Sequence, residues 1–190
     1  MNIANRKNIF QKLPEKEEIQ SFFLTASAVI NFWSMIAFLY SLPSLLSQMT
    51  LQEISSILSI FFTVSFVETI SITAFMTALA WILPKKWLSE NFHIHSFILL
   101  IFFLLFVLPS YLLRSPVSKI IINLLSNYNI FIWRIIVLLS IILYLIRKNK
   151  LNNKDIQVLH NIISRISILG GLFIVLDLMA VLYIILQKVI

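Results

Sequence analysis

The stretch FFTVSFVETISITAFMTALAW, residues 61–81, decides the fold class of this chain. At about 1.5 Å per residue, a helix of this length can cross the roughly 30 Å hydrocarbon core of a bilayer. Its only ionisable side chain is Glu68, near the middle. An ionised carboxylate in hydrocarbon costs at least about 2.5–3.5 kcal/mol. Glu68 is therefore a candidate functional residue inside a predicted transmembrane helix.

The composition of the whole chain agrees with this interpretation. The 190 residues are 59% hydrophobic and 12% charged, whereas soluble domains carry about 25% charged residues. A chain this apolar has too little polar surface for a water-soluble globule. The absence of cysteine excludes disulfides, thiolate chemistry and cysteine metal sites. The net charge of +7 reports membrane orientation, and we expect no nucleic-acid partner.

Five segments are long and apolar enough to span a membrane. They define one all-α integral membrane domain, residues 1–190, with a polar leader at 1–21 and an uncleaved first span. The predicted spans are residues 22–42, 57–83, 94–113, 129–146 and 166–187. The sequence therefore predicts a bundle of five transmembrane helices.

The basic residues predict the orientation of this bundle. Most of the 15 Lys and Arg residues lie in the leader, between the second and third spans, and between the fourth and fifth. Cytoplasmic loops carry such an excess. We therefore expect a cytoplasmic N-terminus and an external C-terminus, in a membrane that we take to be the cell membrane of a prokaryote.

Three segments outside the spans have readable helix signals. Thr50 and Glu53 match a capping box, which predicts a helix from about residue 51 to 83. Residues 116–127 repeat apolar side chains on one face and predict an amphipathic helix on the outer leaflet. Residues 156–166 have a similar period and predict a cytoplasmic extension of the last helix.

Small polar residues gather on one face of three spans. In lipid, small residues let helix backbones approach closely and hydroxyls bond across the contact. The first, second and fifth spans therefore predict the core, whereas FILLIFFLLFVL, residues 97–108, predicts that the third span is the most lipid-exposed. The core-facing residues are Ser27, Asn31, Ser34 and Ser41; Ser65, Thr69, Thr73 and Thr77; and Ser167, Gly170 and Asp177.

Depth in the membrane pairs the remaining polar side chains. Glu68 and Arg134 lie on helices of the same direction, and Glu68 leans toward the level of Arg134, which predicts an ion pair. Asn31 and Asp177 lie at similar depth and predict a second contact. Two acids and one base leave a negative charge, to be met by a proton, a cation, a water or a partner. The pairs have a structural alternative as cross-braces, and Arg134 could instead reach the outer phosphates.

Soluble-enzyme motifs are missing: there is no P-loop, G-x-G-x-x-G, H-E-x-x-H or G-x-S-x-G. His93, His95 and His160 lie on the predicted cytoplasmic side, where a metal or haem site is a minor alternative. We expect no metal and no cofactor. The missing motifs favour a non-enzymatic role and leave an intramembrane enzyme open.

Two functions follow from these observations. The favoured one is a subunit, anchor or scaffold that binds another membrane protein through the outer helix or the faces of the first, second and fifth spans. The alternative is a small oligomeric transporter or channel that uses Glu68 and Asp177 as cation or proton sites.

Overall fold

The computed structural model describes residues 13–83, 91–114, 127–147 and 153–189. All regular elements in these ranges are α-helices, as predicted. Most of the expected outer amphipathic helix, 116–127, lies outside the described residues. The five helices are α2 (Lys16–Gln48), α3 (Leu51–Ile82), α5 (Phe92–Arg114), α7 (Asn127–Arg147) and α8 (Asn153–Val189).

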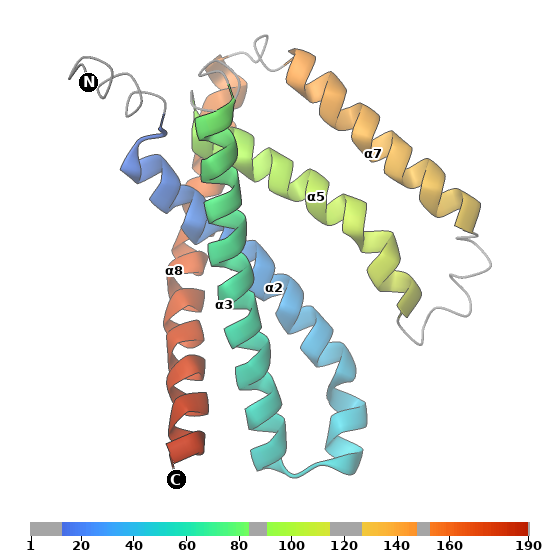
Figure 1. Ribbon diagram of the computed structural model, residues 1–190, viewed down its shortest axis with the longest axis vertical. Helices are drawn as coiled ribbons and strands as arrows, with labels where there is room; N and C mark the ends of the chain where they lie inside the picture. The colour runs from blue at the N-terminus through green and yellow to red at the C-terminus, as the bar shows by residue number, and fades with distance from the viewer. Residues whose placement is uncertain (1–12, 84–90, 115–126, 148–152, 190) are drawn as a thin grey trace, which may run out of the picture.

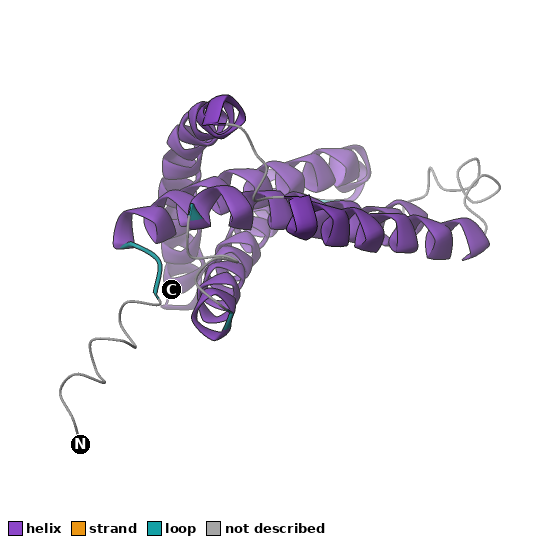
Figure 2. Cartoon of the chain, turned by 90° about the horizontal axis from the view of Figure 1, so that it is seen from above, coloured by secondary structure: helices purple, strands orange, loops and turns teal. Residues whose placement is uncertain are grey.

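The helices run alternately in opposite directions along the molecule. Figure 1 shows α2 descending obliquely across α8 and α3, α3 ascending, and α8 descending again. Seen from above in Figure 2, the described elements are all helices, and they cross one another at wide angles rather than lying parallel. The main contacts join α2, α3 and α8 to one another, whereas α7 packs mainly against α5.

Three of the helices are long and apolar enough to cross a membrane. They are the ranges Lys16–Gln48, Leu51–Ile82 and Ile156–Gln187. In α5 and α7 the apolar stretches found among described side chains are shorter, Phe92–Phe106 and Ile132–Ile141. The three long helices are the ones whose small polar faces predict the core.

The start of α3 confirms the predicted capping box. The Thr50 hydroxyl accepts from the backbone N–H of Glu53 at 3.4 Å, and the Glu53 carboxylate accepts from the backbone N–H of Thr50 at 2.8 Å. These bonds satisfy amides that the first helical turn leaves without partners. Only Met49 and Thr50 separate α2 from α3, so these helices form a tight antiparallel hairpin.

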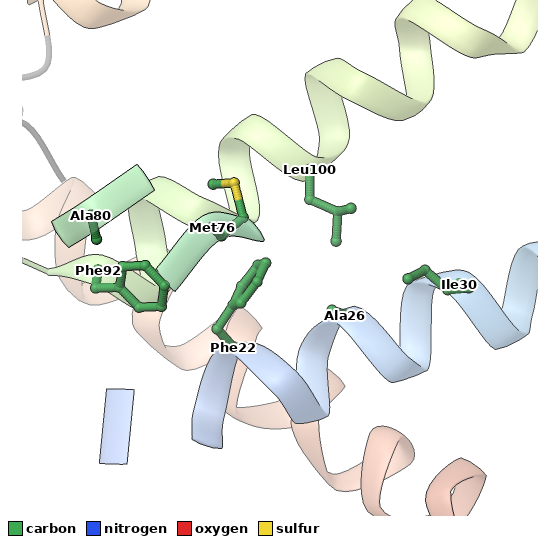
Figure 3. Close-up of a cluster of buried hydrophobic side chains, with 7 residues drawn as sticks. All are labelled: Phe22, Ala26, Ile30, Met76, Ala80, Phe92 and Leu100. Carbon is green, nitrogen blue, oxygen red and sulfur yellow. The ribbon is translucent and has the colours of Figure 1, made fainter. Parts of the chain in front are cut away.

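The apolar core lies where α2, α3 and α5 meet, toward the ends that hold residues 22, 80 and 92 (Figure 3). The rings of Phe22 and Phe92 pack edge to face with centroids 5.7 Å apart, a geometry worth about 0.5–1.5 kcal/mol beyond its buried area. The cluster consists of Phe22, Ala26, Ile30, Met76, Ala80, Phe92 and Leu100.

This cluster corrects one prediction. The predicted third span, 94–113, was expected to be the most peripheral helix, yet Ile94 and Leu100 of α5 are 1% and 3% exposed. Side chains without polar atoms pack against a helix as well as they face lipid, because association in lipid depends on van der Waals fit. The more peripheral helix is α7.

The backbones of α2 and α8 touch at one point. A Cβ added at Gly170 would lie 1.7 Å from the backbone oxygen of Leu24, whereas one added at Gly171 would meet nothing within 4 Å. Only a residue without a side chain lets the two backbones approach this far. Gly170 therefore sets the distance between α2 and α8.

The α2–α3 contact is held by hydroxyl groups. The Ser65 hydroxyl of α3 donates to the Ser34 hydroxyl of α2 at 2.6 Å. The same Ser65 oxygen lies 2.9 Å from the Phe61 carbonyl oxygen of its own helix. Ser65 and Thr69 are fully buried, as the small-residue ridge of the second span predicts.

Candidate functional site

Asn31 and Asp177 form the most buried polar contact between helices. The Asn31 side-chain amide of α2 donates to the Asp177 carboxylate of α8 at 3.1 Å, and both residues are 0% exposed. The same amide nitrogen lies 3.1 Å from the Ser27 carbonyl and 3.3 Å from the Ser27 hydroxyl. The predicted Asn31–Asp177 contact is therefore confirmed.

The backbone geometry explains why these residues meet. Gly170 precedes Asp177 by seven residues, two helical turns, and so lies on the same face of α8. Its close approach to Leu24 brings the α8 backbone onto α2, and Asn31 lies two turns beyond Leu24 on that face of α2. The glycine contact thus places amide and carboxylate within hydrogen-bonding distance.

Each partner of this contact keeps one buried oxygen without a hydrogen-bond partner. These atoms are Asn31 Oδ1 and Asp177 Oδ1. A buried acceptor left unsatisfied costs about 1–3 kcal/mol. Chemically, the pair offers two acceptor atoms and a carboxylate to a ligand that can donate or carries positive charge.

Glu68 lies in a different environment on α3. It is exposed in the isolated chain and lines an open groove of about 640 Å³ between α2, α3 and α5. Neighbouring groove residues include Ser34 and Ala37 of α2, Val64 of α3 and Leu104 of α5. The groove is mostly apolar, with the carboxylate of Glu68 as its one ionisable group among the lining residues.

The predicted Glu68–Arg134 ion pair is not formed. Among the described side chains, the one ion pair joins Glu18 to His93. Arg134 lies on α7, which packs mainly against α5, and its guanidinium stands 5.3 Å from the centroid of the Phe106 ring. The prediction matched the two residues in depth, but pairing also requires neighbouring helices, and α7 does not lie beside α3.

A polar junction that the sequence did not predict joins three helices, at the end of the molecule where α2, α5 and α8 begin. The Glu18 carboxylate of α2 accepts from the backbone N–H of Phe92 at 3.1 Å and lies 3.3 Å from His93 Nδ1 of α5. His93 Nε2 lies 3.1 Å from His160 Nδ1 of α8. Glu18 thus caps α5 in trans, at a helix start where an acidic group is favoured.

The backbone conformation of Asn91 marks the start of α5 at this junction. Asn91 adopts φ 56°, the left-handed conformation that Asn tolerates best after Gly, directly before α5. Such a residue starts the helix abruptly and leaves its first amides open for a capping side chain. The sequence shows the three histidines on one side, but not that Glu18 reaches them from α2.

The described residues do not gather metal ligands. No group of three or more His, Asp or Glu side chains in the described ranges could hold a metal ion. His95 instead bonds to the Tyr144 hydroxyl and ties α5 to α7. The Asn31–Asp177 contact and the Glu18–His93–His160 junction can bind protons or hydrogen-bond donors, and both link one helix to another.

Comparison with known proteins adds no relative. The chain matches no protein-family model, and neither the curated proteins nor the solved structures contain a significant match. Function therefore has to be inferred from the residues themselves.

Proposed function

We propose that the chain is a five-span membrane protein with a cytoplasmic N-terminus and an external C-terminus, in a prokaryotic cell membrane. Three helices have the length and composition of spans. The helices α5 and α7 have 23 and 21 residues, about 35 and 32 Å of helix, which also exceeds the roughly 30 Å core. The alternating helix directions support five crossings.

We propose further that this protein is a non-enzymatic subunit or scaffold, whose groove between α2, α3 and α5 binds a transmembrane helix of another protein. The observation that carries the proposal is Glu68. It lies in the groove with no hydrogen bond or ion pair to any described residue. It is about 26 Å from the start of α3 and about 21 Å from its end, at 1.5 Å per residue.

Charge complementarity identifies the occupant. A carboxylate at mid-depth costs at least about 2.5–3.5 kcal/mol in lipid, and such groups pair with one another inside membranes. A partner helix with Lys or Arg at the matching depth would offset this cost. The small side chains of Ser34, Ala37 and Ser71 in the groove suit the close approach of such a helix.

Site-specific photo-crosslinking in intact membranes tests this proposal. A crosslinker replaces Val64, which lines the groove, or Ile70, which lies about 120° around α3 from Val64 and outside the groove. The two are matched controls, because both are branched aliphatic residues with exposed fractions of 50% and 46%. We expect Val64 alone to capture a membrane protein that carries a basic residue in a span.

A charge exchange makes the result specific. Glu68→Lys should abolish the crosslink at Val64, and replacing the partner's basic residue with Glu should restore it. Capture that survives Glu68→Leu, capture of a second copy of this chain, or equal capture from Ile70 contradicts the proposal.

A transporter or channel is the second candidate, because two core helices carry carboxylates and Asp177 keeps a buried acceptor oxygen. Ion or proton flux into liposomes containing the purified protein tests it, with Glu68→Gln and Asp177→Asn as variants. Flux that neither substitution changes removes both carboxylates from any mechanism.

A further inference from the structure

The α2–α8 contact contains an imbalance of donors and acceptors. The Asn31 amide nitrogen donates to Asp177 Oδ2, which leaves Asn31 Oδ1 and Asp177 Oδ1 as buried acceptors on the two partners. An ionised carboxylate can only accept, and so cannot satisfy an amide oxygen. A carboxylic acid carries one O–H donor in addition. One proton therefore corrects the imbalance on both residues.

We propose that Asp177 binds a proton in the folded protein and forms a neutral, cyclic acid–amide pair with Asn31. In this pair Asn31 donates from its nitrogen to Oδ2 of Asp177, and the protonated Oδ1 of Asp177 donates back to the amide oxygen of Asn31. The proton is taken from solvent during folding, and no other bond changes. The inference does not depend on the occupant of the Glu68 groove.

The ligand set favours a proton over a metal cation. Hard cations take about six to eight oxygen ligands in proteins. Besides the two unsatisfied atoms, the described surroundings of the pair offer Asp177 Oδ2 and the carbonyl and hydroxyl oxygens of Ser27, all of which lie beside the Asn31 nitrogen. These five oxygens are fewer than such a cation takes and three of them already accept from the Asn31 nitrogen, and no described group of His, Asp and Glu ligands could hold a metal.

No basic side chain neutralises Asp177 in the described structure. Asn31 is its one hydrogen-bond partner there, and the helices packed against α8 are chiefly α2, α3 and α5. Glu68 of α3 points into the groove instead. The other ionisable side chains described on these helices are Lys16, Glu17, Glu18, Tyr40, Glu53, His93 and His95, with Lys154, His160, Arg165 and Tyr183 on α8 itself.

Loss of the proton has a mechanical consequence. It places a negative charge opposite the carbonyl dipole of Asn31, two turns from the point where Gly170 touches the Leu24 backbone. The O–H···O bond would be lost, and only the bond from the Asn31 amide nitrogen to Asp177 Oδ2 would still link α2 and α8. Alkaline pH should therefore weaken this helix pair first.

The test is the stability of the full chain, purified in detergent, between about pH 5 and pH 9. The folded state binds one more proton than the unfolded state at Asp177, so stability must fall as pH rises. The unfolding equilibrium constant should increase by up to tenfold per pH unit, in addition to the contribution of other groups. Asp177→Asn keeps a cyclic amide pair without a proton, and should remove this part of the slope.

Three results overturn the proposal. The first is an identical pH slope in Asp177→Asn and the unaltered protein. The second is stabilisation by sodium relative to choline in the unaltered protein but not in the variant, which identifies a metal cation. The third is an infrared spectrum at about pH 5 in which the carbonyl stretching band of a protonated, buried carboxyl group is absent, or is the same in Asp177→Asn as in the unaltered protein.

Discussion

The two carboxylates inside the core helices have opposite environments. Asp177 is fully buried against Asn31 at a crossing so tight that Gly170 has no room for a Cβ. Glu68 lies exposed in a groove where no described side chain bonds to it. A carboxylate in a membrane helix needs a partner, and of these two only Asp177 has one among the described residues. The first environment stabilises this fold, and the second is suited to a partner from outside.

The largest loss of stability should come from adding a side chain at Gly170, where α8 crosses α2. Gly170→Ala puts a methyl group 1.7 Å from the Leu24 oxygen, so α2 and α8 must move apart. We expect a loss of at least about 3 kcal/mol, the upper range for overpacked cores, measured by unfolding in detergent micelles.

Gly171→Ala is the matched control for this change. Its Cβ meets nothing within 4 Å, and Ala stabilises a helix by up to about 1 kcal/mol relative to Gly. Equal destabilisation by the two substitutions would mean that the close crossing of α2 and α8 does not exist.

The next effect concerns the polar contact itself. Asn31→Leu removes the single described partner of the Asp177 carboxylate, which leaves a buried polar group without hydrogen bonds. Such a loss costs about 1–3 kcal/mol. The double variant with Asp177→Leu should recover much of this loss, because replacing both members of a buried polar pair can be nearly neutral. Additive losses in the double variant argue against the contact.

A smaller loss of stability should follow at the polar junction of α2, α5 and α8. Glu18→Ala removes the capping carboxylate that holds the start of α5 against α2. We expect a loss of about 1 kcal/mol and faster hydrogen exchange at the Phe92 amide. Glu17→Ala, one residue away in the same first turn of α2, is the control and should leave that amide protected. Exchange that stays slow in both variants would exclude the capping role of Glu18.

The smallest effect should come from Glu68. Glu68→Gln removes a charge that no described residue bonds to, so the isolated chain should change by no more than about 0.5 kcal/mol. The contrast with Asn31→Leu separates the two carboxylates by experiment. A loss of several kcal/mol on Glu68→Gln would indicate an internal partner and would make the two environments alike.

Residues whose signals are local along the chain were predictable. The five helices follow from apolar length, the start of α3 from Thr50 and Glu53, and the mutual packing of α2, α3 and α8 from small residues at helical spacing. The Asn31–Asp177 contact follows from depth combined with the polar faces of two core helices.

The errors share one physical cause. Depth along the membrane normal can be counted in residues, whereas the lateral order of helices depends on how their surfaces fit. Glu68 and Arg134 match in depth but belong to helices that are not neighbours. Similarly, Ile94 and Leu100 look lipid-facing in sequence and are buried in the core. Glu18 was missed because a capping residue from another helix leaves no local pattern.

The distance in sequence between Asn31 and Asp177 has a consequence for biosynthesis. They are separated by 146 residues, which a ribosome takes roughly 7–30 s to add at about 5–20 residues per second. The α2–α3 hairpin is synthesised long before α8. The Ser65–Ser34 hydrogen bond can therefore form early, whereas Asn31 has no Asp177 to bond to until α8 is made. During that interval the amide of Asn31 faces lipid or an insertion factor. The nascent chain is therefore expected to be most open to quality-control proteases just before its last helix enters the membrane.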